Sequence, residues 1–95
     1  MRTFPFEISV PENPAGAFSL TVRVKIPEDA QASEVITYIR SHAMKQDLAN
    51  GWIRQNAANH GLEVRGGPRP ITEDPQNLNS KLLAYEQEFR LCPKV

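Results

Sequence analysis

Hydrophobic and polar residues alternate in two runs within the first 26 residues of the chain. Successive side chains of a strand point to opposite faces, so each run predicts a strand with one apolar and one polar face. A Pro-Glu-Asn-Pro-Ala-Gly segment at 11–16 separates the runs and favours a turn. The chain is therefore predicted to begin with an amphipathic β-hairpin, whose apolar face needs a cover because isolated hairpins are marginal in water. The apolar positions are Phe4, Phe6, Ile8 and Val10 in the first run and Phe18, Leu20, Val22, Val24 and Ile26 in the second.

A helix that begins near Ser33 is the predicted cover for this hairpin. The Ser33 side chain can cap a first turn, and Glu34 favours the positive end of the helix dipole. Apolar residues then recur at helical spacing and predict a stripe that packs against the hairpin. The stripe consists of Val35, Ile36, Ile39, Ala43 and Met44.

A second helix is predicted from Gly51 to Asn59, with Trp52 and Ile53 facing inward. The pair Asn50-Gly51 often marks a tight hairpin turn, but its flanks here are helical. We therefore interpret the pair as a helix break or kink. Gly61 suits the left-handed conformation that commonly ends a helix.

The segment after the helices is predicted to be largely irregular. Residues 62–65, Leu-Glu-Val-Arg, suit a short extended piece. The next five residues, Gly-Gly-Pro-Arg-Pro at 66–70, combine the most flexible residue type with two residues that lack an amide donor. They predict a loop.

The C-terminal segment fits two patterns. A helical stripe can be drawn through Leu78, Leu82, Tyr85, Phe89 and Cys92, with Asp74-Pro75 as the helix start. Alternation over residues 83–91 predicts instead a third strand, with Glu86 and Glu88 on the polar face opposite Arg23 and Lys25. Residue propensity favours the helix. The strand is favoured because a two-stranded hairpin needs a further strand to be stable. We choose the strand and keep the helix as the alternative.

These elements predict an α+β fold in a single domain over residues 1–95. The sheet is expected to have three antiparallel strands, the N-terminal hairpin plus the C-terminal strand, covered on one face by two helices in the order ββααβ. A content of 40% hydrophobic and 23% charged residues is ordinary for a soluble globular domain. The apolar runs are too short to span a bilayer, and the N-terminus lacks the apolar core of a signal peptide. A single cysteine, Cys92, fits a reducing compartment, so we expect a cytoplasmic protein.

The net charge is zero, because eleven Lys and Arg residues balance eleven Asp and Glu residues. This balance removes the strong positive field of a nonspecific nucleic-acid binder. The balance is uneven along the chain: residues 35–72 carry five cations against two carboxylates. The middle of the chain is therefore modestly basic.

The residue pattern predicts no catalytic, cofactor or metal site. His42, His60 and Cys92 do not have the spacing of a zinc site, and Cys92 lies too near the C-terminus to support a preorganised nucleophile. Glu86 and Glu88 are more simply explained as solvated charges than as an acid and base pair. We therefore expect a protein that is not an enzyme.

Seven polar residues are candidates for binding. Arg54, Gln55 and Asn59 have the side chains that read base edges, and Arg65 and Arg69 could contact phosphates. Arg23 and Lys25 lie on the predicted polar face of the hairpin.

Two functions follow from these residues. The leading hypothesis is a small non-enzymatic binding protein that occupies the surface of a protein partner. Accessory and inhibitor proteins of this size, including those of viruses and plasmids, often have no active site. The alternative is a nucleic-acid-binding protein that uses the basic polar helix and loop at residues 54–69. A homodimer formed through edge strands is a further option, because unpaired strand edges can pair between chains.

Overall fold

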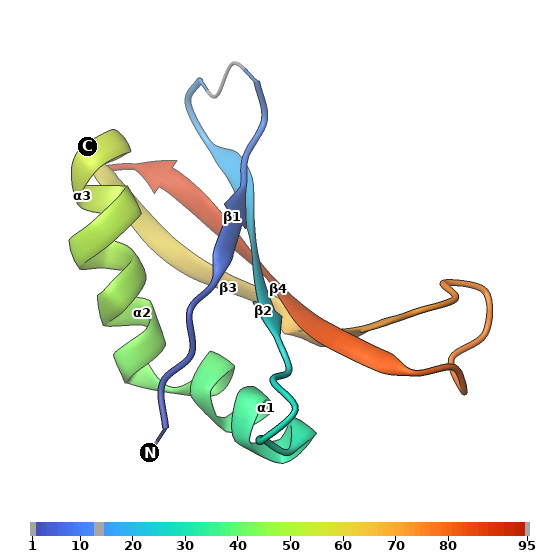
Figure 1. Cartoon of the computed structure of the whole chain (residues 1–95). Helices are drawn as coiled ribbons and strands as arrows, with labels where there is room; N and C mark the ends of the chain where they lie inside the picture. Colours follow the sequence, from blue (N-terminus) through green and yellow to red (C-terminus); the bar gives the residue numbers. More distant parts are fainter. Residues whose placement is uncertain (1, 13–14, 95) are drawn as a thin grey trace.

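Four strands form one antiparallel sheet in the order β1-β2-β4-β3, with helices on one of its faces (Figure 1). The computed structural model describes residues 2–12 and 15–94. The α+β class with an antiparallel sheet and a helical cover is confirmed, but the sheet has a fourth strand and the order is ββααββ. The strands are β1 (Glu7–Ser9), β2 (Phe18–Lys25), β3 (His60–Thr72) and β4 (Leu82–Pro93). The helices are α1 (Ala32–Arg40), α2 (His42–Leu48), the π-helical η1 (Ala49–Ile53) and α3 (Arg54–Asn56).

The predicted N-terminal hairpin is present, with Ile8 opposite Val22 in the β1–β2 pair. β1 is shorter than the alternation suggests, because the ladder begins only at Glu7, after Pro5. Phe4 nevertheless reaches the core, where it is 5% exposed. Residues 13–14 of the predicted turn lie outside the described residues.

The first helix begins slightly earlier than predicted, and Gln31 rather than Ser33 caps it. The Gln31 amide donates a hydrogen bond of 2.8 Å to Oε2 of Glu34, which is one half of a capping box. The helical layer breaks at Ser41, whose hydroxyl accepts a 3.2 Å hydrogen bond from the Met44 amide and caps α2. The Ser41 side chain thus satisfies a free amide at the start of α2, and the helical layer changes direction there (Figure 1).

Of the break or kink predicted at Asn50-Gly51, the break does not occur, because the helix continues through this pair as a π-helical turn. The second helix ends at Asn56, three residues earlier than predicted, because Ala57 leaves the helical conformation. Gly61 is therefore not a helix cap. It lies in β3 opposite Cys92, and strand pairing has replaced the expected helix end.

The predicted loop at 66–70 is also wrong, because these residues belong to β3. Arg65 pairs with Glu88 and Arg69 with Glu86, so three residues, 66–68, face only Gln87 across the ladder. They form a β-bulge, in which Gly66 has a φ of 69°. The prolines are tolerated because β3 is an edge strand, which needs amide donors on one side only.

The Gln87 side chain holds this bulge. Gln87 is 3% exposed, and its Nε2 donates hydrogen bonds of 3.1 Å to the carbonyl oxygens of both Arg65 and Gly66. A buried amide therefore satisfies carbonyls that the bulge removes from the ladder. The extended segment predicted at 62–65 is confirmed as the first part of the same strand.

The C-terminal segment is the predicted strand, and its helical alternative is wrong. β4 lies between β2 and β3 and pairs along both of its edges. This double pairing overrides the helical propensity of its Ala, Glu, Gln and Leu residues. Asp74-Pro75 lies in the turn between β3 and β4 rather than at a helix start.

The core lies between the helices and the sheet. Leu20, Val22 and Val24 of β2 are fully buried, as are Phe89 and Leu91 of β4. Tyr38 of α1 is 1% exposed, and its hydroxyl donates a 2.8 Å hydrogen bond to Oδ2 of Asp47. Burial and the Asp47 carboxylate both raise the pKa of the Tyr38 hydroxyl above its ordinary value.

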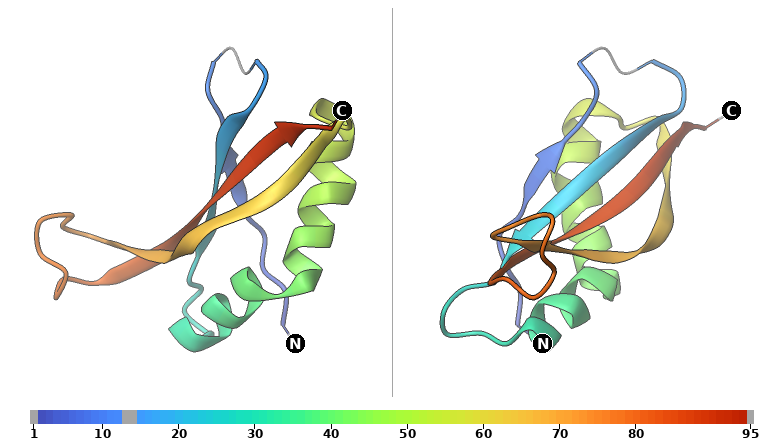
Figure 2. Two further views of the ribbon diagram at one scale, coloured as in Figure 1. Left: turned by 180° about the vertical axis from the view of Figure 1, so that it is seen from behind. Right: turned by 90° about the vertical axis from the view of Figure 1, so that its right-hand side faces the viewer.

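The β3–β4 hairpin extends beyond the helical layer as an arm (Figure 2). Residues 73–81 form the tip of this arm, between the ends of the two strands. The tip is closed by a 2.7 Å hydrogen bond from the Glu73 amide to the Lys81 carbonyl. Leu78 lies in the tip and is 72% exposed.

The bulge predicts different effects of alanine at its two glycines. Gly66→Ala should lower the free energy of unfolding by about 1–2 kcal/mol, because an added Cβ is unfavourable in the left-handed region. A Cβ at Gly66 would meet no atom within 4 Å, so the cost comes from the backbone alone. Urea unfolding followed by Trp52 fluorescence measures it.

Gly67→Ala is the matched control for that substitution. Its Cβ would lie 3.8 Å from Nη2 of Arg40, which is ordinary contact, and Gly67 does not have a positive φ. We expect its effect to stay below about 1 kcal/mol. Equal effects of the two substitutions would contradict the role of Gly66.

The Gln87 side chain gives a second prediction. Gln87→Met keeps the length of the side chain but removes the amide, so the free energy of unfolding should fall by about 1–3 kcal/mol. Gln76→Met, on the exposed tip, should change it by less than about 0.5 kcal/mol. A Gln87→Met protein as stable as the parent would show that the bulge does not depend on this amide.

Candidate binding face of the sheet

The sheet has a second face, opposite the helices, which no helix of the described residues covers (Figure 2). Residues directly opposite one another in an antiparallel pair share a face, so the strand registers identify the side chains that point there. We call this surface the open face. Its polar residues are Glu7, Ser9, Ser19, Thr21, Arg23, Lys25, Glu63, Arg65, Arg69, Glu86, Glu88 and Arg90.

Charges alternate across the strands on the open face. One row runs from Glu7 through Arg23 and Glu86 to Arg69. Arg23 donates to Oε1 of Glu86 from Nη2 at 2.6 Å and from Nε at 3.0 Å, and Nη2 of Arg69 lies 3.6 Å from the other Glu86 oxygen. The Glu86 side chain, only 16% exposed, is therefore held between arginines from both neighbouring strands.

The predicted pairing of two glutamates with two cations is confirmed for Glu86 and Arg23 only. In the observed register Glu88 faces Thr21, and it accepts a 3.3 Å hydrogen bond from the Ser19 hydroxyl. Lys25 faces Ala84, and its Nζ lies 3.8 Å from Oε1 of Glu7 on β1. The strand register decides these partners, and residue types alone do not encode it.

The structure brings four of the seven candidate binding residues together. Arg23 and Lys25 of β2 and Arg65 and Arg69 of β3 all lie on the open face. Arg54 and Gln55 are exposed on α3, in the helical layer. Asn59 lies just before β3, where its carbonyl accepts a 2.6 Å hydrogen bond from the Lys94 amide. The set proposed for nucleic acid, residues 54–69, is therefore divided between the two layers.

Positive and negative groups nearly balance on the open face. Five cations face four carboxylates, from Glu7, Glu63, Glu86 and Glu88. A polyanion that approached the cations would also meet these carboxylates. The face therefore suits a partner of mixed charge better than one of uniform charge.

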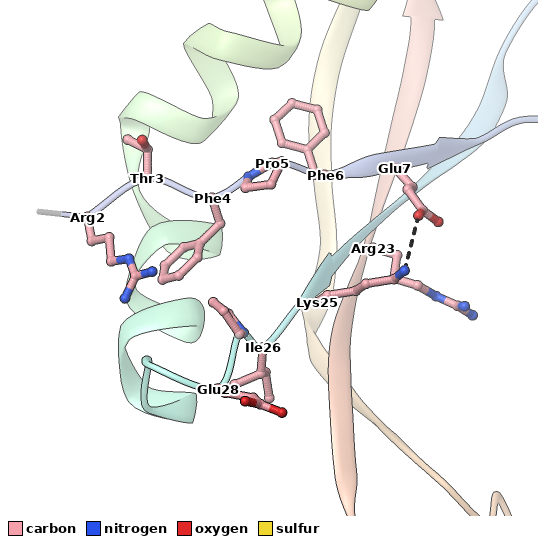
Figure 3. Close-up of a pocket in the computed structure, with 11 residues that line it drawn as sticks. Arg2, Thr3, Phe4, Pro5, Phe6, Glu7, Arg23, Lys25, Ile26 and Glu28 are labelled. Carbon is pink, nitrogen blue, oxygen red and sulfur yellow. Dashed lines mark ion pairs between the residues drawn. The ribbon is translucent and has the colours of Figure 1, made fainter.

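A cleft of about 650 Å³ beside β1 was not predicted from the sequence (Figure 3). Its lining includes Phe4, Pro5 and Phe6 of the N-terminal segment and Ile26 and Pro27, which follow β2. It exists because the N-terminal segment leaves the ladder before Glu7. The signal that could have revealed it is Pro5, which lacks the amide donor that a continued strand needs.

The cations around this cleft are already paired. Nη2 of Arg2 lies 2.9 Å from Oδ1 of Asp29, and its guanidinium centre is 5.0 Å from the centre of the Phe4 ring. The hydrogen bond and the charge of Arg2 hold the pKa of the Asp29 carboxyl below its ordinary value. Figure 3 shows the second pair, between Lys25 and Glu7.

The histidines and the cysteine have structural surroundings. Nε2 of His60 lies 3.1 Å from the Gly16 carbonyl oxygen, and its ring packs edge-on against Phe18 with centroids 5.4 Å apart. His42 is exposed at the start of α2, and Cys92 is half-buried in β4. Among residues 2–12 and 15–94, no three His, Cys, Asp or Glu side chains converge in a group that could hold a metal ion.

Comparison with protein-family models, with curated protein sequences and with solved structures gives no match. In the part of the chain that the structure describes, no helix has both the length and the apolar character needed to cross a membrane.

The contacts of Glu86 predict that it stabilises the sheet more than Glu88 does. Glu86→Gln removes the charge that holds Arg23 and Arg69, and we expect the free energy of unfolding to fall by about 1 kcal/mol. Glu88→Gln, which loses only charge assistance to the 3.3 Å bond from Ser19, should cost less than half of this. Thermal unfolding at low and high salt measures the difference, which should shrink as salt screens the charges. A larger effect at Glu88 would contradict the geometry.

Proposed function

We propose that the protein is a non-enzymatic binding protein that acts by occupying the surface of a protein partner, which it contacts through the open face. The observation that carries the proposal is the convergence of Arg23 and Lys25 with Arg65 and Arg69 on one uncovered sheet face. These cations come from strands separated by β4, and carboxylates lie between them.

The charge pattern supports a protein rather than a nucleic acid as the partner. Binding of nucleic acid depends on a net excess of cations over the phosphate backbone. Here Glu86 and Glu88 lie on the strand between the two pairs of cations and would repel phosphates. A protein surface with alternating charges can complement both signs, which fixes the orientation of a complex and rejects wrong partners.

Contacts within the sheet also hold the face before it binds a partner. β4 is paired on both sides, and Arg23 and Glu86 are already hydrogen-bonded in the free protein. Side chains that are ordered in advance lose less entropy on association. Ser19 and Thr21 are small and leave space for side chains of the partner between the charged groups.

The structure of the edge strands favours the open face, rather than a strand edge, as the surface that contacts the partner. β3 carries Pro68, Pro70 and the bulge, and β1 pairs over only three residues. Short edges, prolines and bulges are features that hinder the addition of another strand. A protein that acts in this way needs no cofactor. An inhibitor or accessory protein of a virus or plasmid is an example of this class, and we propose that the protein acts in the cytoplasm.

Site-specific photo-cross-linking tests this function. A photoreactive residue at Thr21, in the open face, should give one discrete protein adduct in host lysate, which mass spectrometry identifies. The same residue at Gln55, exposed on α3, should not give that adduct. Nuclease treatment before irradiation should leave the adduct intact, whereas its loss would favour the nucleic-acid alternative.

Charge reversal supplies the second arm of this test. Arg65→Glu with Arg69→Glu should reduce binding of the identified partner at least tenfold, because two pairs of complementary charges become repulsive. Arg40→Glu with Arg54→Glu changes the net charge equally at exposed positions on α1 and α3, in the helical layer, and should leave affinity within about twofold. Equal losses in both double variants would refute the open face as the contact.

A further inference from the structure

A small groove lies on the flank of the molecule, between the helices and the bulge of β3. Its volume is about 260 Å³, and its accessible apolar lining comes from Val64 and Pro68. Ile39 and Phe89 lie beneath them and are 1% and 0% exposed. The backbone of 66–68 forms one wall. Val64 is 41% exposed, which is unusual for an aliphatic residue on the helical side of the sheet. The groove is smaller than the roughly 300–1,000 Å³ of pockets for drug-sized ligands, so it suits a single side chain.

The rim of this groove is positive. Arg40 at the end of α1 and Lys45 of α2 line it, and none of its lining residues is acidic. Neither cation forms an ion pair with a carboxylate of the described residues. Asp47, two residues beyond Lys45, accepts the hydrogen bond of the buried Tyr38 hydroxyl. The groove therefore combines an apolar floor with two cations that are available to an acidic ligand.

The tip of the arm, residues 73–81, has the complementary character. Leu78 is 72% exposed, and the carboxylates of Glu73 and Asp74 are exposed and form no ion pair within the described chain. Local hydrogen bonds hold the tip. Among them, the Gln76 amide donates to Oδ1 of Asp74 at 3.0 Å and the Asn79 amide to Oδ1 of Asn77 at 3.0 Å. The tip thus presents an exposed leucine on a segment that carries two carboxylates and one cation, Lys81, so its net charge is negative.

We propose that the tip of one copy of the chain docks into the groove of a second copy, with Leu78 against Val64 and with Glu73 and Asp74 near Arg40 and Lys45. The two surfaces do not meet within a chain, because the strands carry the tip away from the helices (Figure 2). The larger cleft beside β1 is less suitable, because its cations Arg2, Arg23 and Lys25 are already paired.

The tip and the groove are different patches, so the contact is of the head-to-tail type. Each copy at the end of such an assembly keeps a free tip or a free groove. Further copies can therefore add to the assembly, unless it closes into a ring or a two-fold pair. A contact this small falls in the class of weak, transient interfaces. Its charge pairs are exposed, so salt should weaken it. The inference does not rest on the open face or on its proposed partner.

Sedimentation velocity over a wide range of concentration tests the inference. The full chain should associate reversibly at high concentration in low salt. Leu78→Ser removes the apolar side chain of the tip, and Arg40→Glu with Lys45→Glu reverses the rim of the groove. Each variant alone should associate at least tenfold more weakly. Gln76→Ser on the tip and Arg54→Glu on α3 are the matched controls and should associate like the parent.

Mixing the two defective proteins gives the decisive result. The intact tip of the groove variant should bind the intact groove of the Leu78→Ser protein, so the mixture forms a one-to-one dimer that grows no further. Circular dichroism shows that each variant is folded. Three results would overturn the proposal. They are a parent protein that stays monomeric at every concentration, variants that associate as strongly as the parent, and a mixture in which no one-to-one dimer forms.

Discussion

Pairing of β4 along both of its edges is the constraint on which the rest of the structure depends. It joins the N-terminal hairpin to β3 and places Phe89 and Leu91 in the core under the helices. The same strand carries Gln87, whose buried amide allows β3 to bulge without leaving carbonyls unsatisfied. Continued β3–β4 pairing past the helices also forms the arm.

The two faces of the sheet have different physical roles. One face is apolar, is covered by helices and supplies the stability of the fold through burial. The open face is polar, and its ion pairs contribute modestly to stability, because most of their side chains are exposed to water and only Glu86 is largely buried. Its ordered, alternating charges are better suited to selecting a partner than to holding the fold together. The proposal of a binding protein rests on this difference between the apolar, covered face and the polar, open face.

Much of the fold could be predicted from local pattern. Alternation at Phe18–Ile26 predicts β2, and helical spacing predicts the cover. The strand at the C-terminus is favoured over a helix because a hairpin needs another partner. The local pattern gave a wrong prediction at 66–70, where prolines and glycines indicate a loop. These residues can form a strand because β3 lies at the sheet edge and the Gln87 amide bonds to the bulge, and neither fact is visible in the local sequence. The local pattern also did not show that Arg54 and Gln55 lie in the helical layer while Arg65 and Arg69 lie on the sheet. Residue types carry no information about the layer in which a residue lies.

The sequence by itself determined which faces of β2, β4 and α1 are buried, because side-chain periodicity follows directly from backbone geometry. It also determined the zero net charge, which disfavours a polyanion as partner. Only the tertiary structure decided the strand register, and with it that Glu86 lies between Arg23 and Arg69 while Glu88 does not. It likewise placed Arg40 and Lys45, which form no ion pair among residues 2–12 and 15–94, beside an exposed Val64. These arrangements depend on contacts between residues far apart in the chain, which no local pattern encodes.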